Sequence, residues 1–121
     1  NRVVTASLTG AQLRIVLEEM FATSTSKRNL IGAKVSTRRE GEVFKATQIV
    51  KADGAVVGDS DRLRVAMNSY DAQSGGQRFM SLRQMLAEPH SRTRHEPIET
   101  RAALIDFLAQ HRTVSLADLP G

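Results

Sequence analysis

Hydrophobic and polar residues alternate with two different periods along the chain, and these periods predict its secondary structure. Residues 2–8 ("RVVTASL") carry β-branched side chains with a weak alternation, which predicts a short strand. A helix is predicted over residues 9–21, because Thr9 and Gln12 form a capping box at its start and an apolar stripe follows. The stripe consists of Leu13, Val16, Leu17 and Met20.

The middle of the chain has the short period of strands. Residues 30–38 and 42–51 are predicted to be two strands, with a turn at 39–41. Asp53-Gly54 stands between apolar runs and is a strong hairpin signal. Residues 62–67 alternate cleanly and are predicted to form a further strand. The residues on its apolar face are Leu63, Val65 and Met67.

Helical periodicity returns towards the C-terminus. Residues 79–88 predict a helix closed by Pro89, and residues 100–111 predict another, capped by Thr100. The segment "PHSRTRHEP" between them is polar and is expected to be irregular and exposed, and the tail "TVSLADLPG" suggests no further element. The predicted order β-α-β-β-β-β-α-α indicates an α+β fold with helices packed on an antiparallel or mixed sheet.

Composition limits the classes of function. The 121 residues are enough for one domain, and no apolar run approaches the roughly 20 residues that a membrane span needs. The lack of cysteine excludes disulfides and thiolate chemistry. A net charge of +4 would suit an anionic partner, but the basic residues are scattered. A solvated surface is therefore favoured over nucleic-acid binding.

No recognisable set of catalytic residues stands in the sequence. His90, His95 and Glu96 share one polar segment and superficially suggest a metal site, but a convincing third or fourth ligand is lacking. The chain has neither a Gly-x-Ser-x-Gly elbow nor the glycine patterns of P-loops and dinucleotide folds. We therefore predict no metal and no catalytic residue in this chain.

The stretch "NSYDAQSGGQRF", residues 68–79, places two of only five aromatic residues around a Gly-Gly pair. Gly75 and Gly76 permit positive φ and close approach, while Tyr70 and Phe79 offer flat apolar faces. Arg78 adds a planar cation with five donors. Such a composition suits a ligand-binding loop and equally a plain turn between a strand and a helix.

The order of several segments resembles the C-terminal domain of the 5′-nucleotidases. "NRVVTASLTGAQLRIVLEE" is similar to that domain's opening, where a strand leads into a Leu-Thr-Gly-x-x-Leu helix start. "LRVAMNSYDAQSGGQRF" resembles its strand ending in Val-Ala-x-Asn, followed by an aromatic and a Gly-Gly loop. "IETRAALIDFLAQH" looks like its closing helix. With "LIGAKV" and "ADGAVV" in order between them, the resemblance spans nearly all of residues 1–121.

The resemblance implies a substrate-binding domain for a nucleotide or nucleoside. In this family an N-terminal metallophosphoesterase domain of the same polypeptide holds two divalent metal ions and performs the hydrolysis, and many members are exported. Tyr70 would then stack on the base, and Gly75 and Gly76 would shape the loop. Asn68 and Gln77 would bond polar groups of the base or sugar, with Arg78 beside them. The isolated chain would be inactive.

Three departures from the family pattern bear on nucleotide recognition. Gln77 and Arg78 stand where many members have an Asp-Gly pair, and the spacing from Tyr70 to Gly75 is one residue longer. The family's second stacking aromatic should precede "IGAKV", where the sequence has "TSTSKRN". Phe44, on the next predicted strand, is the candidate substitute. Two alternatives therefore remain: a non-catalytic binding or interaction module without a nucleotide site, and a nucleic-acid binder.

Overall fold

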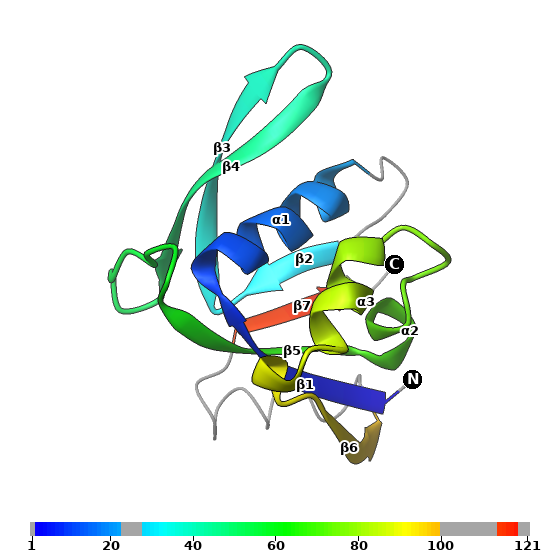
Figure 1. Cartoon of the computed structure of the whole chain (residues 1–121). Helices are drawn as coiled ribbons and strands as arrows, with labels where there is room; N and C mark the ends of the chain where they lie inside the picture. Colours follow the sequence, from blue (N-terminus) through cyan, green and yellow to red (C-terminus); the bar gives the residue numbers. More distant parts are fainter. Residues whose placement is uncertain (1, 23–27, 100–113, 119–121) are drawn as a thin grey trace.

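The computed structural model describes residues 2–22, 28–99 and 114–118, which form a small mixed α/β domain (Figure 1). Its elements are β1 (Arg2–Thr9), α1 (Gly10–Phe21), β2 (Arg28–Ile31), β3 (Ala33–Glu40), β4 (Val43–Lys51), β5 (Arg62–Asn68), α2 (Ser69–Ala72), α3 (Met80–Leu86), the 3₁₀ turn η1 (Pro89–Ser91), β6 (Arg94–Glu99) and β7 (Val114–Asp118).

The larger of two sheets has the strand order β2-β7-β5-β1-β6. Its neighbouring strands are antiparallel except for β5 and β7, which run parallel. In the central pair, Val3 of β1 lies opposite Asn68 of β5, and Thr9 lies opposite Arg62. Strands β3 and β4 form a separate two-stranded sheet, a long hairpin that projects past α1 (Figure 1). The predicted antiparallel or mixed sheet with helices packed on it is confirmed.

The hydrophobic core lies between the larger sheet and the helices, which cover the same face of that sheet (Figure 1). Alternate residues of β1 and β5 point into the core, as the predicted apolar face of residues 62–67 requires. The predicted stripe of α1 is buried against them, so both patterns are confirmed. The largest fully buried side chains of this core are Val4, Leu8, Leu13, Val16, Leu17, Ile49, Val65, Met67, Phe79 and Leu82.

The helix predicted over 9–21 is α1, and its capping box is complete. The Thr9 hydroxyl accepts from the Gln12 N–H at 3.1 Å, and the Gln12 side chain accepts from the Thr9 N–H at 2.9 Å. The helix predicted over 79–88 is the shorter α3. The helix predicted over 100–111 lies outside the described residues.

One predicted strand is divided in two. Gly32 has a φ of +91° and separates β2 from β3 within the predicted strand 30–38. Because an extended strand needs negative φ, the chain changes direction there, and the two halves join different sheets. Asp53-Gly54 does form the expected tight turn, where Gly54 has a φ of +88° and Val50 bridges Val56.

Two predictions about polar segments are wrong. "PHSRTRHEP" is not irregular, because η1 turns the chain and β6 then pairs with the outer edge of β1, placing His95 opposite Val4. The tail does contain a further element, since β7 lies between β2 and β5. A strand at such a position forms because its main chain makes hydrogen bonds with a strand that is distant in the sequence. Its polar side chains therefore do not identify it as a strand.

Glycine is required at the start of α1 by a close approach of two backbones. A Cβ on Gly10 would lie 2.1 Å from the carbonyl oxygen of Gly58. The Gly10 N–H donates to the Asp61 carbonyl at 2.9 Å, and the Ala11 N–H donates to the Asp59 carbonyl at 3.1 Å. These bonds satisfy two of the donors that a helix start leaves free. The loop that precedes β5 therefore caps α1.

We predict that Gly10→Ala destabilises the domain by about 3 kcal/mol, although alanine favours helix more than glycine does. The new methyl group has to displace the Gly58 backbone, and the two capping hydrogen bonds are lost with it. Urea unfolding measures the effect. Gly41→Ala is the control, because Gly41 has positive φ but open space around it, and it should cost only about 1 kcal/mol. A Gly10→Ala variant as stable as the parent would contradict the packing.

Two adjacent glutamates of α1 attach other elements to it. Glu18 Oε2 accepts from the Ala46 N–H of β4 at 3.0 Å, and Glu18 Oε1 lies 3.7 Å from Lys45 Nζ. Glu19 accepts from the first N–H groups of α3, at 3.0 Å from Ser81 and 3.3 Å from Leu82. Phe79, at the N-cap of α3, provides no side-chain bond. Glu19 therefore caps α3 from a neighbouring helix.

Replacing Glu19 by alanine should lower the free energy of unfolding by about 1 kcal/mol, the usual effect of removing a helix N-cap. Glu19→Gln should lose less, because the amide oxygen can still accept from the same N–H groups. Thermal unfolding followed by circular dichroism compares both with Glu42→Ala in the β3–β4 turn. Equal losses for Glu19→Ala and Glu42→Ala would show that the cap contributes nothing.

Candidate functional site

The stretch at 68–79 begins where β5 leaves the sheet. Asn68 Oδ1 accepts from the Asp71 N–H at 2.7 Å and so caps the single-turn helix α2. Asn68 is only 2% exposed. Asn68, the first of the predicted ligand contacts, thus lies in the interior, where its side-chain oxygen holds the backbone of α2.

Four successive residues of the loop have positive φ. The values are +105° at Ser74, +56° at Gly75, +70° at Gly76 and +70° at Gln77. Glycine adopts such angles freely, but Ser74 and Gln77 are strained in this region. The loop is fixed by its own hydrogen bonds: the Gly75 N–H donates to the Tyr70 carbonyl at 2.9 Å, and the Phe79 N–H donates to the Ser74 carbonyl at 2.8 Å.

Each aromatic of the stretch packs against one glycine. A Cβ on Gly75 would lie 2.8 Å from Phe79 Cδ2, and a Cβ on Gly76 would lie 2.8 Å from the Tyr70 hydroxyl oxygen. The Gly-Gly pair is therefore needed twice, for its backbone angles and for these contacts. Phe79 is 1% exposed and belongs to the core, whereas Tyr70 is 48% exposed. The hydroxyl end of the tyrosine ring lies against Gly76, and about half of the residue is exposed.

Sequence reasoning missed one residue beneath the loop. Asp71 is 2% exposed, and one of its carboxylate oxygens would lie 3.1 Å from a Cβ on Gly75. Its backbone carbonyl accepts from the Ser74 N–H at 3.0 Å. The sequence feature that could have pointed to Asp71 is its position in the first turn of a helix, where an acidic side chain complements the helix dipole.

The remaining predicted contacts lie at the surface. Gln77 and Arg78 are exposed, and the Gln77 N–H donates to Ser74 Oγ at 3.1 Å. Phe44 is not beside Tyr70, because the β3–β4 hairpin that carries it lies on the other side of α1 from α2 (Figure 1). The Arg39 guanidinium lies 5.9 Å from the Phe44 ring centroid. Residues 23–27, within the segment where the second aromatic was sought, are outside the described residues.

Among the residues that the structure describes, no three or more histidine, aspartate or glutamate side chains gather where they could hold a metal ion. His90 lies on η1 and His95 on β6, and both are exposed. Glu96 lies 4.0 Å from the Arg94 guanidinium. No helix within 2–22, 28–99 or 114–118 is long and apolar enough to cross a membrane.

Comparisons with protein-family models, with curated proteins and with solved structures find no match to this chain. The resemblance to the 5′-nucleotidases consequently rests on the sequence segments quoted above.

We predict that alanine at the two glycines has different effects. Gly75→Ala should destabilise the domain by about 2–3 kcal/mol, because it pushes on the buried Phe79 ring as well as straining the backbone. Gly76→Ala should cost about 1–2 kcal/mol and displace the Tyr70 hydroxyl. The chain has one tyrosine and no tryptophan, so its fluorescence reports on Tyr70 alone.

Acrylamide quenching of that fluorescence, combined with urea unfolding, separates the two effects. Gly76→Ala should change quenching in the folded state, whereas Gly75→Ala should chiefly lower stability. Unchanged quenching in a folded Gly76→Ala variant would show that Tyr70 does not rest on Gly76.

Proposed function

We propose that this chain is the substrate-binding domain of a 5′-nucleotidase-like phosphohydrolase that hydrolyses nucleotide phosphate esters, and that its fold is that of the 5′-nucleotidase C-terminal domain. The observation that supports this most is the position of Tyr70. It is a half-exposed aromatic residue on the single-turn helix α2, directly before the hydrogen-bonded Gly-Gly loop, at the position where the resemblance expects a base-stacking residue.

The loop has properties suited to stacking. A ring anchored at one end loses little conformational freedom when a base stacks on it, so more of the contact energy is retained as affinity. A stacked base contributes about 1–3 kcal/mol in nucleic-acid systems. The exposed side chains of Gln77 and Arg78 follow in the same loop and supply donors for sugar or phosphate oxygens.

Hydrolysis is assigned to another part of the polypeptide. An N-terminal metallophosphoesterase domain would hold two divalent metal ions, which activate a water and stabilise the charge that develops on the phosphoryl group. The present chain would contribute no catalytic residue and would position the nucleoside. Such an enzyme would be exported, as many members of the family are.

One observation favours the alternative of a non-catalytic interaction module with the same fold. The side-chain oxygen of Asn68 accepts from the Asp71 N–H, and the residue is buried. Its role is then structural, and the strand-to-loop pattern would persist without a nucleotide site. The two proposals differ in whether Tyr70 contacts a ligand.

We predict that the 121-residue chain binds adenosine weakly, with a dissociation constant of about 1 mM or higher, because one stacked face barely offsets the entropic cost of association. Amide chemical shifts of Gly75, Gly76 and Gln77 should move first during a titration. Tyr70→Phe should bind almost as well, because stacking needs the ring and not the hydroxyl. Tyr70→Ala should abolish binding while remaining folded.

Phe44→Ala is the matched control, because Phe44 is a similarly exposed aromatic on a distant hairpin. It should leave adenosine binding unchanged. Two results would sink the nucleotide proposal in favour of the interaction module. One is the absence of any shift at Gly75–Gln77 up to about 20 mM adenosine. The other is equal weakening by Phe44→Ala and Tyr70→Ala.

A further inference from the structure

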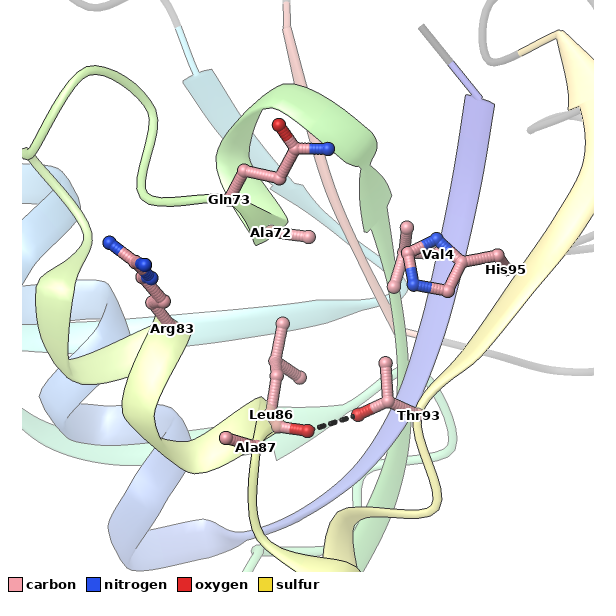
Figure 2. A pocket seen from close by; sticks show the side chains of 8 residues that line it. All are labelled: Val4, Ala72, Gln73, Arg83, Leu86, Ala87, Thr93 and His95. Atoms are coloured by element: carbon pink, nitrogen blue, oxygen red, sulfur yellow. Dashed lines mark hydrogen bonds between the residues drawn. The ribbon is translucent and has the colours of Figure 1, made fainter.

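A concave site lies on the helix-covered side of the larger sheet, next to its β6 edge (Figure 2). It is a pocket of about 420 Å³ between α2, α3, β1 and β6. Its apolar lining consists of Val4, Ala72, Leu86 and Ala87. This volume is in the lower part of the range for small-molecule pockets, which commonly combine an apolar lining with a few polar groups.

The walls of the pocket are held together by the chain that turns from α3 into β6. Thr93 Oγ1 donates to the Leu86 carbonyl at 2.8 Å, and Ser91 Oγ donates to the same carbonyl at 3.1 Å. On the opposite wall, His95 is the register partner of Val4, so both side chains lie on the same face of the sheet. The end of α3 and the edge strand are therefore fixed relative to one another, with the pocket between them.

Four polar side chains line the pocket, and the hydroxyl of one of them, Thr93, already donates to the Leu86 carbonyl. Arg83 of α3 and His95 of β6 stand on opposite sides of it, and the Gln73 amide stands between them beyond the end of α2 (Figure 2). Among the residues that the structure describes, no aspartate or glutamate lines it. The Arg83 guanidinium and the neighbouring donors are thus not offset by a carboxylate within this described lining, which favours a negatively charged occupant.

From this arrangement we propose that the pocket binds a small organic anion, with its apolar body on Ala72, Leu86 and Ala87. Its acidic group is bound by the Arg83 guanidinium, which can hold a carboxylate or a phosphate through two parallel hydrogen bonds. Gln73 and His95 bond the remaining polar atoms. A molecule the size of one aromatic ring with one acidic substituent suits this volume.

This site is separate from the proposed base platform. Tyr70, Gly76 and Gln77 are not among the residues that line the pocket, although Ala72 and Gln73 come from the α2 turn that carries Tyr70. The inference therefore does not rest on the proposed function, and the two can fail independently.

The test is a titration of the 121-residue chain with phenyl phosphate and with benzoate, followed by amide chemical shifts. The amides of Leu86, Ala87 and Thr93 should move, and those of Gly76 and Gln77 should not. Benzyl alcohol, a neutral compound of similar size, should bind about tenfold more weakly, the loss expected when one charge-assisted hydrogen bond is absent. Using both acids distinguishes a phosphate from a carboxylate ligand.

Arg83→Gln should weaken binding of either acid by about tenfold, and His95→Gln by a smaller factor. Arg94→Gln is the matched control, because Arg94 precedes His95 on the same strand and so points to the opposite face. It removes the same charge and should change affinity less than about twofold. Tyr70→Ala should leave this binding unchanged. These substitutions are at exposed positions, so the variants should stay folded.

Three results would overturn the proposal. They are equal weakening by Arg83→Gln and Arg94→Gln, shifts confined to residues 70–78, and no shift at Leu86 or Ala87 up to about 50 mM of either acid.

Discussion

The contact between the start of α1 and the loop before β5 determines the arrangement of much of the domain. β1 continues into α1 without a linker, so the direction of the helix over the sheet is set at Thr9 and Gly10. The backbone carbonyls of Asp59 and Asp61 accept hydrogen bonds from the first N–H groups of the helix, and Arg14 forms an ion pair with the Asp59 carboxylate. Only a residue without a side chain lets the two backbones come this close.

The position of α1 in turn affects the candidate site through a series of contacts. α1 positions α3 through Glu19, and α3 begins next to Phe79. The buried Phe79 ring packs against Gly75, so the shape of the Gly-Gly loop follows from the core beneath it. A loop whose shape is set by the core in this way is pre-organised before any ligand arrives.

Much of the fold could be predicted because its signals are local. The capping box of α1 and the alternation of Leu63, Val65 and Met67 depend on neighbours within a few residues. The weak alternation of β1 also has a cause: Val3 and Thr5 are fully buried on the face opposite Val4. A strand buried on both faces does not alternate between apolar and polar residues.

The parts that could not be predicted depend on distant partners or on single dihedral angles. β6 is a strand because it pairs with β1, and β7 is a strand because it pairs with β2 and β5, which are all distant in the sequence. The positive φ of Ser74 and Gln77 is imposed by the loop, since neither residue type favours it. The resemblance pointed to Tyr70 and the glycines. It gave no sign that the Asn68 side chain would cap α2, nor that Asp71 would be buried.

The strand order also has a consequence for how the chain acquires its structure during synthesis. β1 is synthesised before the other strands of this domain, yet its two neighbours in the sheet are β5 and β6. Val3 can pair only after Asn68 has been synthesised, and Arg2 only after Glu99. Contacts that join such distant positions require large loops to close, and they slow folding. Until residues 62–99 have been made, both edges of β1 lack these partners, and an unpaired apolar strand favours association with other chains. The larger sheet can therefore form only after most of the domain has been synthesised.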